Sequence, residues 1–122
     1  MKTDSQALGR WGEEQAARFL TERGYSILER NVRTPYGEID LIARQADGML
    51  IFVEVKARAS ELYGQPEVSV TPKKKQHLLA AIQTYLQTHP ELGENCRCDV
   101  IAIRRRSPGE PPEITHFENA VS

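Results

Sequence analysis

Two charged residues, Glu54 and Lys56, follow the most apolar short stretch of the chain, residues 49–53. This stretch predicts a β-strand, in which side chains two positions apart point to the same face. Glu54 and Lys56 therefore lie together, while Val55 faces the other way. Burying such charges is unfavourable unless they are paired or bound to a metal ion. Other parts of the fold must therefore provide partners for the charges of Glu54 and Lys56.

A second acid, Asp40, lies on the strand predicted just before it. If residues 46–48 form a three-residue loop with Gly48 in the left-handed conformation, Asp40 pairs with Glu54. A two-residue turn at 47–48 would instead send the Asp40 side chain to the other face. Two carboxylates directly opposite each other on adjacent strands repel unless a cation lies between them. A metal-site hypothesis therefore predicts the three-residue loop.

The pattern along the chain predicts one α/β domain spanning residues 1–122, with a mixed sheet flanked by helices. The order of elements is αβββαβ, with a short additional strand near the C-terminus. Thr71 is the expected N-cap of the second helix, with Pro72 at its first position. The predicted helices cover residues 5–23 and 71–88, the strands cover 25–32, 38–45, 49–58, 98–104 and about 114–117, and 59–70 is a loop.

The first predicted helix carries another acid on its inward side. Helical spacing places Glu13 on the same face as Ala16, Ala17 and Leu20. The next residue, Glu14, falls on the outer face, where an ordinary ion pair accounts for it. We therefore expect the Glu13 carboxylate to point toward the sheet.

The formal net charge of −1 and the isoelectric point near 6.3 are not typical of a nucleic-acid-binding protein, which is usually basic. Cationic residues are nevertheless clustered locally, and such a cluster can bind nucleic acid even when the net charge is negative. Lys73, Lys74 and Lys75 lie in the first turn of the second helix, where they oppose the helix dipole. A DNA phosphate would relieve the mismatch, while a solvated basic face is the alternative.

Other features exclude several classes of protein. No apolar run approaches the length of a membrane span, and the N-terminus lacks the pattern of a signal peptide. We therefore expect a cytoplasmic protein with no membrane partner. Cys96 and Cys98 have no histidine partners at zinc-site spacing, which favours free thiols. The three histidines are expected at the surface.

The ordered motifs resemble a known family. The chain is similar to the YraN-like family of small bacterial proteins, which resembles the archaeal Holliday junction resolvases within the PD-(D/E)xK nucleases of restriction-endonuclease-like fold. The motif proline is replaced by Ile39. The segments that carry the resemblance are Gly12-Glu13, residues 37–43, residues 52–56 and residues 98–103.

The resemblance implies an endonuclease that hydrolyses DNA, acting on branched or damaged structures, and uses Mg²⁺ or Mn²⁺. Asp40, Glu54 and the backbone carbonyl of Val55 would bind the metal, and Glu13 would complete or orient its shell. Lys56 would hold the attacking water or stabilise charge on the phosphate. Resolvase-like members often work as homodimers, but no apolar stripe here marks an interface. The expected DNA-binding residues are Lys73, Lys74, Lys75 and Arg58.

Other interpretations stay open at this point. Asp40 can cap a strand, and Glu54 with Lys56 can form a charge ladder on an exposed edge strand. Asp99 opens a later strand, and a structural role is favoured for it. At the level of function, the alternatives are a non-catalytic nucleic-acid-binding module and a protein-interaction subunit.

Overall fold

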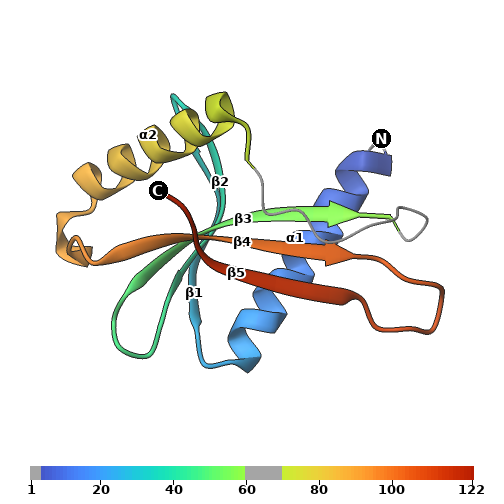
Figure 1. The fold of residues 1–122 in the computed structure, drawn as a ribbon. Coiled ribbons are helices and arrows are strands. Elements are labelled where there is room, and N and C mark those ends of the chain that lie inside the picture. Colours follow the sequence, from blue (N-terminus) through green and yellow to red (C-terminus); the bar gives the residue numbers. More distant parts are fainter. Residues whose placement is uncertain (1–3, 60–69) are drawn as a thin grey trace.

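The computed structural model describes residues 4–59 and 70–122, which form a five-stranded mixed sheet between two helices (Figure 1). The strands lie in sequence order across the sheet. Only β3 and β4 pair in parallel, and α2 makes the crossover between them. The elements are α1 (Asp4–Glu22), β1 (Ser26–Thr34), β2 (Gly37–Arg44), β3 (Leu50–Arg58), α2 (Pro72–Thr88), a 3-10 turn η1 (Pro90–Leu92), β4 (Cys96–Arg104) and β5 (Glu113–Val121).

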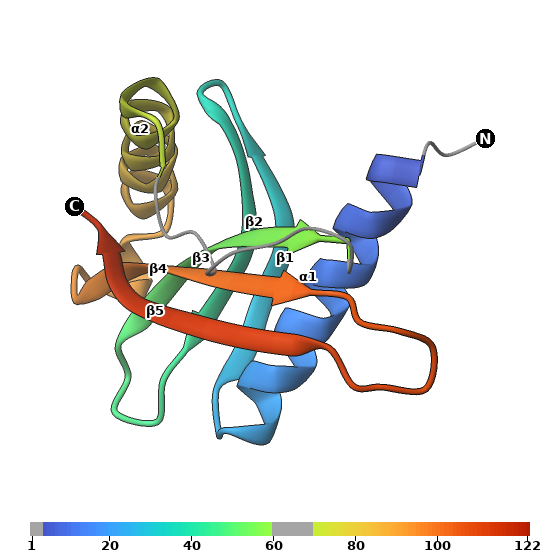
Figure 2. The ribbon, with the colours of Figure 1, turned by 45° about the vertical axis from the view of Figure 1, so that its right-hand side comes forward.

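Each helix covers one face of the sheet (Figure 2). On the α2 face, Phe52 of β3 packs against Leu78 and Tyr85. On the α1 face, Val53, the next residue of β3, packs against Leu20. Successive side chains of a strand alternate between faces, so the continuous apolar run of β3 serves both cores.

The helix α1 approaches β3 very closely at Gly12. A Cβ atom built on Gly12 would lie 2.6 Å from the Cβ of Ala57, closer than such atoms approach in real structures. Glycine therefore allows the close contact that brings the neighbouring Glu13 to the end of β3. Gly9, by contrast, has open space around it.

The helix α2 begins as predicted. The Thr71 side chain accepts a hydrogen bond from the Lys74 N–H, and Pro72 occupies the first turn. This cap fixes the direction in which the first turn projects its lysines over the sheet.

The α/β class and the predicted order of elements are confirmed. The C-terminal strand is longer than expected, and β4 begins two residues earlier. The expected loop at 59–70 lies mostly outside the described residues. Within the described ranges, no helix is both long enough and apolar enough to cross a membrane.

The β2–β3 hairpin adopts the predicted three-residue loop. Gly48 has a φ of +96°, and its N–H donates to the Gln45 carbonyl. The Gln45 N–H in turn donates to Met49, which closes the loop. The resulting register pairs Leu41 with Val53, and the same register extended by one residue sets Asp40 against Glu54.

Candidate metal centre

The strands β2 and β3 separate at Asp40. Their backbone pairing ends at Leu41 and Val53, although β2 continues to pair with β1 beyond this point. The Asp40 side chain fills the opening, because its Oδ2 accepts the Val55 N–H at 2.8 Å. A carboxylate thus takes the place of a backbone acceptor at the fork between the two strands.

The course of β2 also changes at Asp40. Ile39 packs in the core on the α2 face, whereas Leu41 packs in the core on the α1 face. Side chains two positions apart share a face in a regular strand, so β2 twists sharply here. In β1, Asn31 lies opposite Asp40 between two paired residues and has a φ of +51°. Backbone of this kind concentrates at functional sites.

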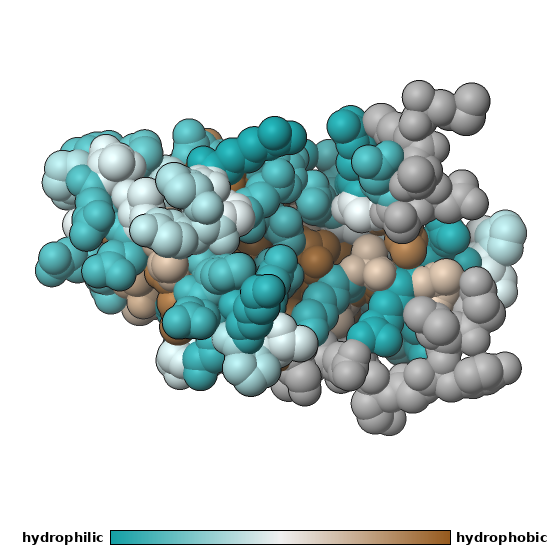
Figure 3. All heavy atoms as spheres, turned by 90° about the horizontal axis from the view of Figure 1, so that it is seen from above, coloured by the Kyte–Doolittle hydropathy of each residue, from teal (hydrophilic) through white to brown (hydrophobic). Residues whose placement is uncertain are grey.

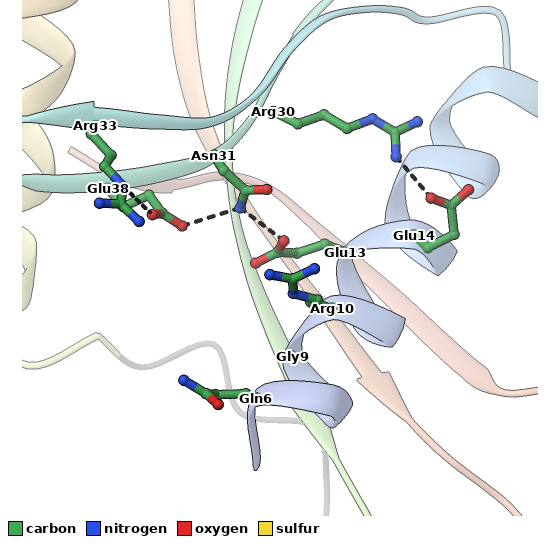
Figure 4. A pocket seen from close by; sticks show the side chains of 9 residues that line it. All are labelled: Gln6, Gly9, Arg10, Glu13, Glu14, Arg30, Asn31, Arg33 and Glu38. Carbon is green, nitrogen blue, oxygen red and sulfur yellow. Dashed lines mark hydrogen bonds and ion pairs between the residues drawn. The ribbon is translucent and has the colours of Figure 1, made fainter. Parts of the chain in front are cut away.

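Three acids meet at this fork. Carboxylate oxygens of Glu13 from α1 and of Glu38 and Asp40 from β2 all lie within 4.8 Å of one another. Two oxygens bound to one Mg²⁺ at about 2.1 Å lie at most about 4.2 Å apart, so little adjustment is needed for them to share a cation. The Asn31 amide nitrogen donates to Glu13 at 2.8 Å and to Glu38 at 3.1 Å, which holds both acids in place (Figure 4).

The fourth acid, Glu54 of β3, is close enough to Asp40 to raise its pKa and is only 8% exposed. Its Oε2 is 3.5 Å from the Lys74 ammonium of α2. Its Oε1 is buried and has no hydrogen-bond partner among the described residues. An unpartnered buried carboxylate oxygen is costly, which makes it a natural ligand atom for a cation.

The electrostatics of Asp40 reflect this crowding. Burial is the largest influence and, with repulsion from Glu54 and then Glu13, raises the pKa of Asp40 to about 7. The Val55 N–H and the Lys74 ammonium oppose this rise. The net effect is that the neighbouring acids repel the ionised Asp40 more strongly than these two groups stabilise it.

Glu54 and Lys56 do not form the exposed charge ladder that was the alternative interpretation. The strand β3 is the middle strand of the sheet, and Glu54 is buried, so an edge ladder is excluded. Lys56 is half-buried and follows Glu54 by two positions on β3. Val55 points to the α1 face, where it packs against the core.

The predicted DNA-binding residues come from the end of β3 and the start of α2. Arg58 is half-buried at the end of β3. Lys73, Lys74 and Lys75 are exposed in the first turn of α2. Of these three lysines, Lys74 forms the ion pair with Glu54.

Sequence reasoning missed Glu38 and Asn31. Glu38 precedes Asp40 by two positions, and this spacing on a strand could have placed both carboxylates together. Asn31 has no such signal, because its role depends on the turned backbone of β1. The link between Lys74 and Glu54 depends on how α2 packs and is equally invisible in the sequence.

A cleft lies beside the acids, between α1 and the β1–β2 hairpin, with a volume of about 660 Å³ (Figure 4). Glu13, Asn31 and Glu38 form the part of the cleft that adjoins Asp40. Arg30, in the same cleft, is paired with Glu14 at 2.8 Å. The other residues of the cleft wall are Gln6, Gly9, Arg10 and Arg33.

Asp99 forms a separate buried network on the α1 face. It is fully buried and accepts hydrogen bonds from Arg97 at 3.0 Å, from His116 at 2.7 Å and from the Asn119 N–H at 2.8 Å. Burial raises its pKa, but the bonds from these three partners outweigh burial and lower the pKa below its ordinary value. These contacts support the structural role predicted for Asp99.

The prediction for the histidines is wrong in two cases. The His116 side chain is only 13% exposed and binds Asp99. His89 is half-buried and stacks on Tyr85, with ring centroids 4.0 Å apart. His77 alone is exposed, as expected.

Comparison with known proteins identifies the family. The family model described as "Uncharacterised protein family UPF0102" matches residues 12–103. The chain belongs to this family. The predicted resemblance to YraN-like proteins is thereby confirmed.

Several UPF0102 relatives align over nearly the whole chain. The protein from Syntrophotalea carbinolica is 46% identical over 93% of this chain and 90% of its own length. The protein from Desulforamulus reducens is 40% identical over 99% of this chain and 100% of its own length.

Two solved structures show a more distant likeness. A complex of EndoMS with double-stranded DNA has 20% identity and a TM-score of 0.38, over 71% of this chain and 34% of that one. A repair endonuclease from Pyrococcus abyssi has 21% identity and a TM-score of 0.42, over 89% of this chain and 42% of that one. The chain thus spans less than half the length of either protein.

Proposed function

We propose that this protein is a metal-dependent nuclease that hydrolyses phosphodiester bonds in DNA. The observation that carries the proposal is the convergence of acids on Asp40 from α1, β2 and β3. Such a group of carboxylates, short of positive charge, is the arrangement that a divalent cation stabilises.

The donor set fits Mg²⁺ or Mn²⁺, which prefer hard oxygen ligands. Asp40 and Glu54 would hold the cation, with the carbonyl of Val55 as a further ligand and Glu13 completing the shell. Glu38, close to both Glu13 and Asp40, joins this set. The unpartnered Oε1 of Glu54 is the feature that most favours a bound cation. When bound, the cation would polarise the phosphate and lower the pKa of a water molecule.

The residues of the chain itself supply the other requirements of the reaction. Lys56 would stabilise the charge that builds on the phosphate. Lys73, Lys75 and Arg58 would contact the DNA backbone, which positions the strand without reading its sequence. Lys74, 3.5 Å from Glu54, would place a further positive charge beside the bound phosphate.

A second candidate function is a nucleic-acid-binding module without catalytic activity. One contact favours it: Lys74 already neutralises part of the Glu54 charge without a metal. In this case DNA binding would depend on salt and would survive replacement of the acids.

A cleavage assay separates the two candidates. The purified protein is incubated with labelled branched, nicked and single-stranded DNA in Mg²⁺ or Mn²⁺. We expect cleavage that Asp40→Asn and Glu54→Gln each reduce by at least about 100-fold. Glu22→Gln, an exposed acid at the end of α1 that does not line the cleft, is the matched control and should cleave normally. Full cutting by both site variants would contradict the proposal.

A further inference from the structure

An exposed aromatic residue lies close to the acids. Tyr36 is 50% exposed and belongs to neither apolar core. Among the described residues, the other exposed large apolar side chain is Leu28. A tyrosine ring contributes little to folding at such a position, but it offers a flat face for stacking.

The turn that carries Tyr36 is held by hydrogen bonds. The Thr34 hydroxyl donates to the Gly37 carbonyl at 2.8 Å and accepts the Tyr36 N–H at 3.1 Å. The tip of the β1–β2 hairpin extends beside α2, away from the middle of the sheet (Figure 2). Tyr36 is therefore presented on a braced turn, which lowers the entropy lost when a ligand binds.

Two neighbouring hollows, which share Glu38 as a wall residue, form a path from Tyr36 to the acids. A small hollow of about 100 Å³ lies between the hairpin tip and α2, lined by Tyr36, Glu38, Lys74 and His77 among others. Glu38 also lines the large cleft beside α1. Glu38, close to Asp40, is therefore a wall residue of both hollows.

Cations line both parts of this path. Arg33 lies three residues before Tyr36, and its side chain is 90% exposed, with Glu38 at 3.7 Å. Arg10 lines the cleft from α1, and Lys74 lines the hollow from α2. Viewed from above, hydrophilic side chains cover most of this side of the molecule (Figure 3).

We infer that the path binds a single strand of nucleic acid, with Tyr36 stacking on a base and Arg10 and Arg33 contacting phosphates. This inference rests on the proposed nuclease function and names its substrate class. A charged groove with an aromatic side chain is the usual binding surface for single strands. The bases of a duplex are stacked on each other and leave no face free for Tyr36.

The test measures binding without metal, so it does not depend on turnover. A fluorescein-labelled oligonucleotide of about 16 nucleotides, and a duplex of the same sequence, are titrated in EDTA at low salt. We expect Tyr36→Ala to weaken single-strand binding by about 5- to 100-fold. Tyr36→Phe keeps the ring and should stay within about twofold, as should the control Leu28→Ala.

The remaining outcomes overturn the inference. It fails if wild type does not bind the single strand, if Tyr36→Ala binds it like wild type, or if Tyr36→Ala weakens duplex binding by the same factor. In each case, metal-dependent cleavage that requires Asp40 would still support the proposed function. Conversely, single-strand binding that depends on Tyr36, without any cleavage, would contradict the nuclease proposal and favour the non-catalytic binding module.

Discussion

Two aspartates of the sheet, the half-buried Asp40 and the fully buried Asp99, have opposite surroundings. Asp99 receives hydrogen bonds from Arg97, His116 and a backbone N–H, and its pKa falls. Asp40 receives one backbone N–H and faces other acids, and its pKa rises to about 7. The protein provides partners for one carboxylate and leaves the other short of positive charge.

This difference separates a structural acid from a candidate ligand. A fully partnered carboxylate stabilises the fold and has no capacity left for a cation. A crowded carboxylate destabilises the fold unless something else enters the site. We therefore expect opposite consequences when each aspartate is replaced by asparagine.

The largest expected effect is at Asp99. Asp99→Asn leaves Arg97 without its buried counter-charge and should lower the free energy of unfolding by about 3 to 5 kcal/mol. Urea unfolding at pH 7 measures this value. Glu118→Gln, which removes the exposed partner of Arg97, is the control and should cost less than about 1 kcal/mol. If Asp99→Asn lowers the free energy of unfolding no more than Glu118→Gln does, the proposed difference between Asp99 and Asp40 is wrong.

Mn²⁺ should raise the free energy of unfolding by binding at the Asp40 site and not at Asp99. A concentration 100 times the dissociation constant stabilises a protein by about 2.7 kcal/mol. We expect a gain of this order for wild type and little gain for Asp40→Asn, measured by urea unfolding with and without Mn²⁺. Equal gains in both proteins would place the cation elsewhere.

The pH dependence of Asp40 should have the opposite sign to that of Asp99. Because the folded pKa of Asp40 is raised, its stabilising contribution is complete below pH 4 and is lost as pH rises through 7. In EDTA, Asp40→Asn should therefore be more stable than wild type at pH 8, by about 1 to 3 kcal/mol, since the amide oxygen still accepts the Val55 N–H.

The matching profile for Asp99 runs the other way. Its lowered pKa gives a contribution that is complete above about pH 4 and is lost as pH falls through the folded value. Unfolding measured from pH 3 to pH 8 tests both profiles together. Parallel curves for Asp40→Asn and wild type would show that the acids around Asp40 do not repel as described.

The smallest expected effect is at Glu38, which lies at the exposed margin of the site. Glu38→Gln should weaken Mn²⁺ binding by about tenfold, or about 1.4 kcal/mol. Calorimetry measures the affinity directly. Glu22→Gln, an exposed acid at the end of α1, is the control and should bind Mn²⁺ like wild type.

Much of the site could be predicted because it depends on local periodicity. Helical spacing places Glu13 inward, and the three-residue loop sets the register that puts Asp40 opposite Glu54. Strand alternation places Glu54 and Lys56 on one face. Each of these features is encoded within a few residues of the chain.

The features that escaped prediction depend on contacts between distant elements. The Asn119 N–H reaches Asp99 within the stretch where the pairing of β4 with β5 shifts, between Cys98 and Val100. His116 reaches Asp99 from β5, where it pairs with Ile101. Lys74 reaches Glu54 only through the packing of α2 on the sheet. Neither register shifts nor helix placement leave a reliable pattern in one sequence.

The most direct test of the account is a crystal structure of the protein soaked in Mn²⁺, with anomalous scattering recorded. We predict an anomalous peak bound by carboxylate oxygens of Asp40 and Glu54, with Glu13 beside it, and none at Asp99. Crystals that show no peak near Asp40 at saturating Mn²⁺ would contradict the central claim.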